Sequence, residues 1–329
     1  MVKKKSFKTN LLRTWKRVVK RTPQNPHRAF KLTRPRMVRI TRGDVAAIWR
    51  LQTESWRFLR RHWRVLLGIG LLYAVISYVL VGGVSQINFV ALKSAATEAI
   101  AGDLGAVGTA FSMFGAALTG NLASVPSDVQ QFLAGALTLI FWLAVIWAIR
   151  MFMADKEVGI RDALYNSGGP VIPTLVVVVI AVVQLLPAAL GIFVYATAIS
   201  GGWLADGGVE SMVFAGVAIL LTLLSLYFLV SSLMAMVIVA LPGTYPWEAL
   251  VAARGLVMNR RWATVLRIVA LALHVLLLWA VVLIPVFLLD GWLRFDWLPL
   301  VPITVQALIG LTLLYTSIYM YRLYRSLLP

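Results

Sequence analysis

The chain has 329 residues, 60% of them hydrophobic and only 13% charged, with a mean hydropathy of +0.84. Soluble domains average about 25% charged residues, so the composition excludes an ordinary soluble enzyme, a disordered protein and a small secreted domain. The chain has no cysteine, which excludes disulfides and thiolate chemistry, and its three histidines are too far apart in sequence to form a local zinc motif.

The net charge of +18 is concentrated at the N-terminus, where residues 1–42 hold 15 basic residues and no acidic one. From Phe7 to Val19 the apolar residues follow one helical stripe among lysines and arginines, which is typical of an interfacial membrane helix. Each basic side chain near an anionic bilayer contributes ~1 kcal/mol. We therefore predict that a basic cytoplasmic tail, residues 1–43, binds anionic phospholipids. The candidate lipid anchors are Trp15, Lys16, Arg17, Lys20 and Arg21.

Two other partners fit a basic tail. Counterion release favours nucleic acid, but the tail has no recognised nucleic-acid motif, so this partner is the less favoured. An acidic protein partner, including another membrane protein, stays open. The first long apolar run begins only near Val65, which argues against a cleavable signal peptide.

Six apolar runs are long enough to cross a hydrocarbon core of ~30 Å, which takes ~20 helical residues. None contains Asp or Glu, and the alternation typical of a membrane barrel is absent. The runs are Val65–Val84, Phe132–Met153, Val171–Ala196, Met212–Ala240, Thr264–Leu289 and Leu300–Tyr321. The sequence therefore predicts an all-α, polytopic membrane protein, with residues 44–329 as a domain of six transmembrane helices.

Residues 104–118 form a further apolar stretch, but 15 helical residues cover only about 22 Å. With six spans and a cytoplasmic N-terminus, 29 of the 31 basic residues lie inside, and only Lys93 and Arg294 lie outside. This distribution fits the positive-inside rule for a bacterial inner membrane. We therefore interpret residues 104–118 as a helix on or dipping into the outer surface, and we expect both termini in the cytoplasm.

Short amphipathic segments precede the first, third and fifth runs on the predicted inner side, at residues 44–63, 155–166 and 248–262. Each is followed by two spans, which indicates a three-fold repeat of an inner-surface helix and a helical hairpin. Trp and Tyr favour membrane interfaces. We expect Trp63, Trp262 and the tyrosines at the end of the last run to lie there; these are Tyr315, Tyr319, Tyr321 and Tyr324.

Two segments resemble known membrane proteins. Leu241–Leu250 (LPGTYPWEAL), followed by Arg254 and Arg260-Arg261-Trp262, resembles a loop in the membrane domain attached to some glycerophosphodiester phosphodiesterases. Pro26–Arg34 (PHRAFKLTR) resembles a segment of uncharacterised membrane proteins from small-genome, host-attached bacteria. The resemblance implies a six-helix membrane fold. The hydrolytic domain of the phosphodiesterases has no counterpart here, so no catalytic residue or cofactor is carried over.

Apart from Arg150 at the end of the second run, the charged or histidine residues within the spans are Arg267 and His274, seven residues apart on one helix face. Ionisable groups in a bilayer are costly and often functional. Arg267 is one turn from the inner end and can extend to the interface, whereas His274 lies deeper. We expect its imidazole to face a neighbouring span, with Gln184 or a hydroxyl of Ser225, Ser231 or Ser232 as hydrogen-bond partner.

Two functions follow from these patterns. The first is a non-enzymatic protein that organises lipids or partner proteins at the inner leaflet, indicated by the basic tail and the inner-surface helices. The second is a permease or facilitator without its own energy source, indicated by the repeat, by the span prolines and by His274. No cofactor or metal is expected, because the spans hold no carboxylate and the chain has no nucleotide-binding Gly-Lys-Ser/Thr loop.

Overall fold

The structure is a computed structural model that describes residues 46–82, 105–119, 127–201, 208–258, 260–293 and 300–328. These residues are 88% helical and contain no strand. Their ten helices belong to one compact unit, Val45–Pro329. The basic tail with its five candidate lipid anchors lies outside the described residues, so its predicted role stays a prediction.

Six helices in the described part of the chain are long and apolar enough to cross a membrane. They are α3 (Trp63–Leu80), α6 (Asp128–Phe152), α8 (Val171–Ser200), α9 (Val209–Val239), α11 (Arg261–Leu293) and α12 (Leu300–Leu327). Each overlaps one of the six predicted runs. The protein is therefore an all-α, polytopic membrane protein, as the composition predicts.

Four shorter helices accompany them: α2 (Ile48–Arg61), α5 (Gly105–Thr119), α7 (Ile160–Asn166) and α10 (Pro246–Val257). Helices α2, α7 and α10 each precede two long helices, which is the order expected for the suspected repeat. Helix α5 covers the stretch predicted at residues 104–118, and its 15 residues are too few for a span.

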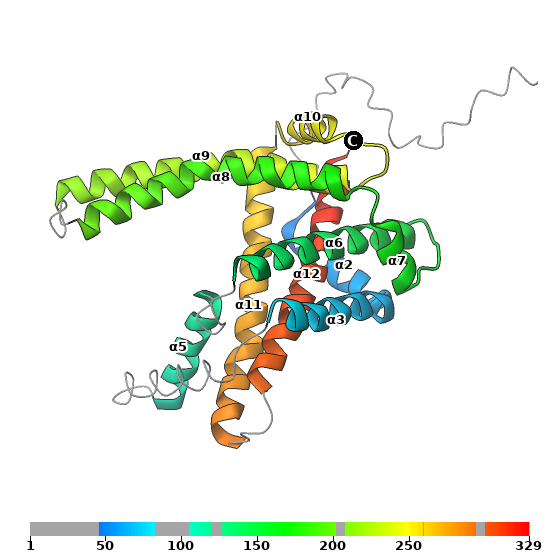
Figure 1. The fold of residues 1–329 in the computed structure, drawn as a ribbon, viewed down its shortest axis with the longest axis horizontal. Coiled ribbons are helices and arrows are strands. Elements are labelled where there is room, and N and C mark those ends of the chain that lie inside the picture. The colour runs from blue at the N-terminus through cyan, green and yellow to red at the C-terminus, as the bar shows by residue number, and fades with distance from the viewer. Residues whose placement is uncertain are drawn as a thin grey trace, which may run out of the picture. The chain divides into compact units, whose positions relative to one another are not determined.

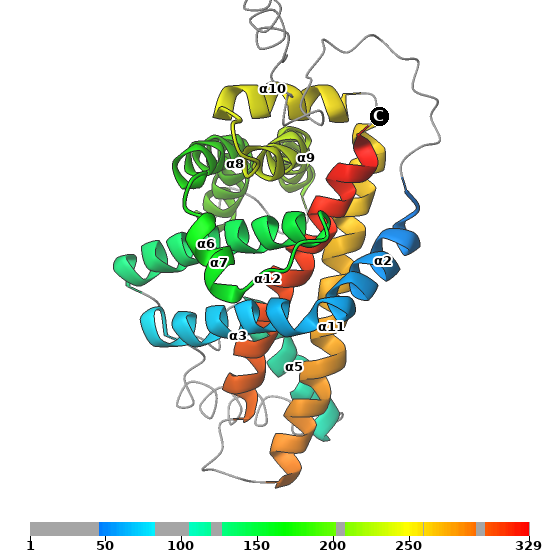
Figure 2. The ribbon, with the colours of Figure 1, turned by 90° about the vertical axis from the view of Figure 1, so that its right-hand side faces the viewer.

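Helix α12 is central to the packing, because it contacts α2, α3, α6, α9 and α11. Figure 1 shows α11 and α12 upright, whereas α8 and α9 form a hairpin that crosses them and projects to one side. In Figure 2 the hairpin is viewed along its axis while α11 and α12 remain upright. The six long helices are therefore not a parallel bundle, and the two members of the hairpin pack mainly on each other.

Glycines allow α3 and α12 to cross at close range. A Cβ atom added to Gly310 would lie 2.7 Å from the backbone oxygen of Gly70, and one added to Gly70 would lie 2.6 Å from Leu314 Cδ1. Such small residues let membrane helices approach closely enough for backbone contact. One turn away, Gln306 Nε2 donates a hydrogen bond of 2.8 Å to Ala74 O.

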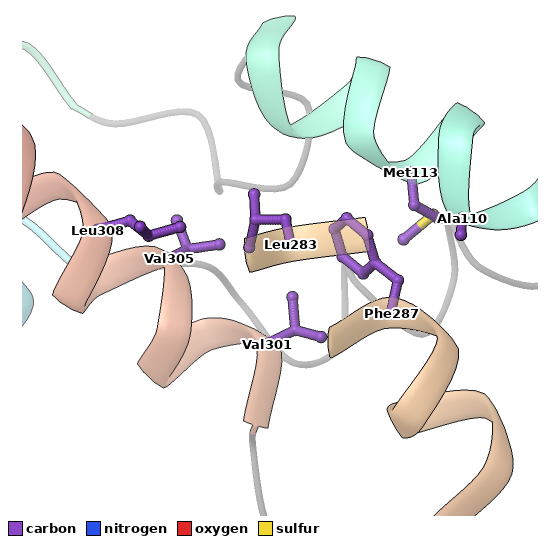
Figure 3. Packing of buried hydrophobic residues seen from close by; sticks show 7 residues of the cluster. All are labelled: Ala110, Met113, Leu283, Phe287, Val301, Val305 and Leu308. Carbon is purple, nitrogen blue, oxygen red and sulfur yellow. The ribbon is translucent and has the colours of Figure 1, made fainter. Parts of the chain in front are cut away.

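Figure 3 shows a second packing centre, at the end of the α11–α12 pair that contacts α5. Side chains from the three helices interdigitate there, with Phe287 of α11 close to Met113 of α5. The cluster comprises Ala110, Met113, Leu283, Phe287, Val301, Val305 and Leu308. This contact fixes α5 against the last two long helices.

The hairpin is held by polar contacts at a proline. Pro187 lies inside α8 and has no N–H of its own, and its ring disrupts the local ladder of backbone hydrogen bonds. The next backbone N–H, that of Ala188, donates across to Ser225 Oγ of α9 at 3.0 Å. Close to this point, a Cβ atom on Gly191 would approach Ala218 Cα to 3.1 Å. Small residues and a hydroxyl therefore set the register of α8 against α9.

Candidate functional site

Arg267 and His274 both contribute to a junction where α2, α11 and α12 meet. The Arg267 guanidinium donates from Nε to Ala46 O at 2.8 Å and from Nη1 to Ala263 O at 2.6 Å. Tyr319 of α12 donates its hydroxyl to the backbone oxygen of Arg267 at 3.0 Å. Arg267 therefore reaches towards the N-terminal end of α11, where it binds backbone oxygens.

His274 stacks on an aromatic side chain of α12. Its ring lies 5.1 Å from the ring of Tyr315, with 27° between the planes. Trp56 of α2 meets the same tyrosine edge-on at 5.9 Å. Tyr315 is only 2% exposed, and its buried hydroxyl has no hydrogen-bond partner within the part of the chain that is described. The imidazole faces a neighbouring helix as expected, but through a ring contact with Tyr315.

Gln184 lies in the α8–α9 hairpin and does not join this junction. Its Oε1 accepts a hydrogen bond of 2.7 Å from Ser232 of α9, and the described residues show no contact between Gln184 and His274. The expected pairing of His274 with Gln184 or with a serine of α9 is therefore not what the structure shows. The physical reason is that α8 packs on α9, which satisfies Gln184 there, whereas α11 turns His274 towards α12.

An ion pair ties the middle of α2 to the last turns of α12. Glu54 accepts hydrogen bonds from Arg50 Nε at 2.7 Å and from Arg322 Nη1 at 2.8 Å. Arg322 also lies over the ring of Phe58, 5.3 Å from its centre. The hydrogen bond from Arg50 and the charge of Arg322 hold the pKa of Glu54 below its ordinary value, so the carboxylate stays charged at neutral pH.

The corner between α2 and α3 is fixed by His62. Its ring stacks on Phe152 at the end of α6, with ring centres 4.2 Å apart, and also contacts Phe58 at 5.0 Å. Burial lowers the pKa of His62, the positive charge of Arg61 lowers it further, and Asp155 opposes the shift. A neutral imidazole at this point packs as an aromatic ring and closes the corner against α6.

Four arginines at this corner are exposed and form no ion pair within the described ranges. We call them the basic corner: Arg57, Arg60, Arg61 and Arg64. Arg60 and Arg64 lie near the rings of Trp56 and Trp63, each 5.9 Å from the ring centre. Trp63 is itself 53% exposed. The corner therefore presents positive charge and an aromatic side chain together on the surface.

A groove of about 430 Å³ lies between α3 and α12. Its walls are almost entirely apolar, and the amide nitrogen of the one glutamine in them is used in the contact with Ala74 O. The lining residues are Leu67, Gly70, Leu71, Ala74, Val75, Tyr78, Pro302, Ile303, Gln306, Ala307, Leu311 and Leu314. The groove has the chemical character of a hydrocarbon site.

The four tyrosines at the end of α12 are buried and contact protein, and their predicted depth at the membrane interface stays a prediction. Tyr315 and Tyr319 contact α2 and α11, and Tyr321 packs on Tyr324 with ring centres 6.3 Å apart. Helix α12 packs against α2, α3, α6, α9 and α11, which surround these rings with protein. One signal was available in the sequence, because α12 has the lowest mean hydropathy of the six long helices.

The junction engages most of its polar groups in contacts between helices, so its chemistry is that of a structural joint. The basic corner and the apolar groove, in contrast, present their side chains outward and are suited to binding. Comparison of the chain with protein-family models, with curated proteins and with solved structures finds no match.

Proposed function

We propose that this protein is a non-enzymatic protein of the bacterial inner membrane, with both termini in the cytoplasm, that organises lipids or partner proteins at the inner leaflet. The observation that carries the proposal is the basic corner, a group of four exposed arginines beside Trp63. Arginine and tryptophan together are the residues that anchor proteins at an anionic membrane interface.

The corner is held in place by contacts with two other helices. Glu54 binds Arg322 of α12, Trp56 packs on Tyr315 of the same helix, and His62 stacks on Phe152 of α6. A charged group that is already positioned loses less conformational freedom when it binds a ligand. The arginines therefore form a fixed surface, which supports a role in ordering headgroups.

The charge distribution supports placing this surface on the cytoplasmic side. The corner belongs to the basic segment that the positive-inside rule assigns to the cytoplasm, together with Arg150 in the last turn of α6 and with Lys156 and Arg161 after it. Cytoplasmic leaflets carry anionic lipids, and each basic residue near such a surface contributes ~1 kcal/mol. Anionic phospholipids are therefore the proposed partners, and nucleic acid is not.

Orientation is tested by cysteine labelling, since the chain has no native cysteine. The substitution Ala154→Cys places a cysteine in the exposed turn after α6. We expect this cysteine to resist an impermeant reagent in intact cells and to react after the membrane is opened. Labelling in intact cells would overturn the proposed orientation.

Lipid organisation is tested by the phospholipids that remain bound to the full-length protein after purification in mild detergent. We expect phosphatidylglycerol to be enriched over its share of the total membrane extract, as measured by mass spectrometry. Replacing all four arginines of the basic corner with glutamine should reduce that enrichment. A matched variant that removes four exposed basic residues elsewhere, Lys156→Gln, Arg161→Gln, Arg254→Gln and Arg325→Gln, should reduce it less. Equal effects of the two variants would contradict the proposed role of the corner.

A further inference from the structure

The basic corner and the apolar groove are linked by one face of α3. Arg64 lies in the first turn of this helix, and Leu67, Leu71, Val75 and Tyr78 follow it at intervals of three or four residues. Residues at these intervals lie above one another along a helix. The arginine therefore stands at the head of the stripe that forms one wall of the groove.

The opposite wall comes from α12, which runs past α3 at the glycine crossing. Ile303, Ala307 and Leu311 face the groove from this side, again one turn apart. Ile303 and Ala307 are exposed, so the surrounding medium can enter between them and α3. In a membrane-spanning pair of helices that medium is the acyl chains of lipids.

The stretch of α3 that lines the groove is about as long as an acyl chain in one leaflet of a bilayer. From Leu67 to Tyr78 the helix rises by about 17 Å at 1.5 Å per residue, and half of a hydrocarbon core of ~30 Å is ~15 Å. The groove begins one turn beyond Arg64. A lipid whose phosphate meets the arginine would therefore place an acyl chain directly at the entrance of the groove.

Charge complementarity selects the headgroup. Arg60, Arg61 and Arg64 are exposed cations, and Asp155 is the acidic group that acts on His62 at this corner. Arginine binds phosphate oxygens through two parallel N–H donors, which gives shorter and stronger hydrogen bonds than neutral donors do. The positive excess at the corner favours a lipid with net negative charge over a zwitterionic one.

We propose that the protein has a specific site for one anionic phospholipid, with the headgroup at Arg64 and one acyl chain in the groove between α3 and α12. The site rests on the proposed function and extends it, because it assigns a defined lipid position to a surface otherwise expected only to attract anionic lipids. The occupant is a membrane phospholipid of the phosphatidylglycerol type.

The site is tested by native mass spectrometry of the full-length protein titrated with palmitoyl-oleoyl phosphatidylglycerol and, separately, with phosphatidylcholine carrying the same chains. Arg64→Gln should weaken binding of the first phosphatidylglycerol about five-fold, with a smaller effect on phosphatidylcholine. Ala307→Phe fills the groove and should weaken both lipids about ten-fold, because the acyl chain is common to them.

Matched controls separate the site from the general lipid surface. Arg254→Gln removes an exposed arginine elsewhere, and Val79→Phe adds a ring to an exposed position of α3 that does not line the groove. We expect both controls to bind phosphatidylglycerol like the unaltered protein. Ile303→Trp provides a second groove filler, and thermal unfolding of each variant checks that the fold is retained.

The outcomes distinguish this inference from the proposed function. The groove site would be overturned if Ala307→Phe and Ile303→Trp affected the preference for phosphatidylglycerol no more than Val79→Phe does. The lipid-organising function would remain intact in that case. Loss of binding for phosphatidylglycerol alone in the groove variants would place the headgroup, and not the chain, in the groove and would also overturn it. A protein with no preference between the two lipids in any form would contradict both proposals.

Discussion

Helix α12 and the α8–α9 hairpin show two ways in which apolar helices of similar length are placed in one membrane protein. In the most apolar stretch of α12, 56% of the residues are buried, against 17% in α9. Helix α12 is nevertheless the less apolar of the two. The polar side chains of α12 find partners on α2, α3 and α11, whereas the hairpin exposes aliphatic side chains on most of its length. The comparison teaches that the least hydrophobic span is the central one, because polar groups in a membrane need protein partners.

The two regions also differ in how helices approach each other. At the α3–α12 crossing, backbone meets backbone at Gly70 and Gly310. In the hairpin, Ser225 accepts a hydrogen bond from the backbone N–H next to Pro187, and Gln184 binds Ser232 about one turn away. The first arrangement is intolerant of added volume, and the second is sensitive to lost hydrogen bonds.

The largest expected effect is at the crossing. Gly310→Ala places a methyl group against the backbone oxygen of Gly70, which no side-chain movement can relieve. We expect it to lower the free energy of unfolding by about 1–3 kcal/mol, the usual cost of overpacking. Gly216→Ala in α9, where an added Cβ meets nothing within 4 Å, serves as the control and should be neutral or slightly stabilising. Thermal denaturation in detergent compares the two, and equal destabilisation would remove the contrast between the regions.

A smaller effect is expected from Ser225→Ala in the hairpin. The substitution removes the hydroxyl that accepts from the Ala188 N–H beside Pro187, at a cost of about 0.5–1.5 kcal/mol, the usual net value of one hydrogen bond. Ser232→Ala removes only a side-chain contact and should cost about 0.6 kcal/mol, the average for interhelical hydrogen bonds in membranes. Unfolding in a denaturing-detergent titration measures both. If Ser232→Ala lowered the free energy of unfolding more than Ser225→Ala, the register of the hairpin would depend on Gln184 and not on the contact between Ala188 and Ser225.

His274→Gln tests whether the α2–α11–α12 junction is a structural joint. Loss of the ring contact with Tyr315 should cost about 0.5–1.5 kcal/mol, as for other aromatic pairs. Under the proposed function, enrichment of phosphatidylglycerol should be unchanged. Proton flux into liposomes that contain the protein, followed by a pH-sensitive dye, provides the second measurement. Flux that disappears with His274→Gln while the fold persists would favour the transport function instead.

The smallest effect is a pH dependence at the basic corner. Burial against Phe152 and the nearby Arg61 lower the pKa of His62 in the folded protein below the ordinary value of 6.5. The unfolded chain therefore binds the proton more readily, so stability is complete above pH 6.5 and falls as the pH drops from 6.5 through the folded-state pKa. His62→Phe keeps the ring contact and should flatten this part of the stability curve in thermal melts from pH 7.5 to 5. A variant as pH-sensitive as the unaltered protein would assign the titration to another group.

The sequence by itself determined the fold class and the number of spans, because a run of about 20 apolar residues has one stable form in lipid, a helix with its backbone hydrogen bonds made internally. It also predicted that Arg267 extends towards the near end of its helix and that the His274 ring faces a neighbouring span. Their partners depended on which helices pack together. Tyr315 lies far from His274 in the chain, and Glu54 lies far from Arg322. Nothing local to these residues indicates that α2 packs along α12. The same holds for the groove, which exists because Gly70 and Gly310 allow α3 and α12 to cross. The hydropathy of a segment indicates whether that segment lies in lipid or in water. Which helices pack together depends on contacts between residues far apart in the sequence, and only the tertiary structure decides those contacts.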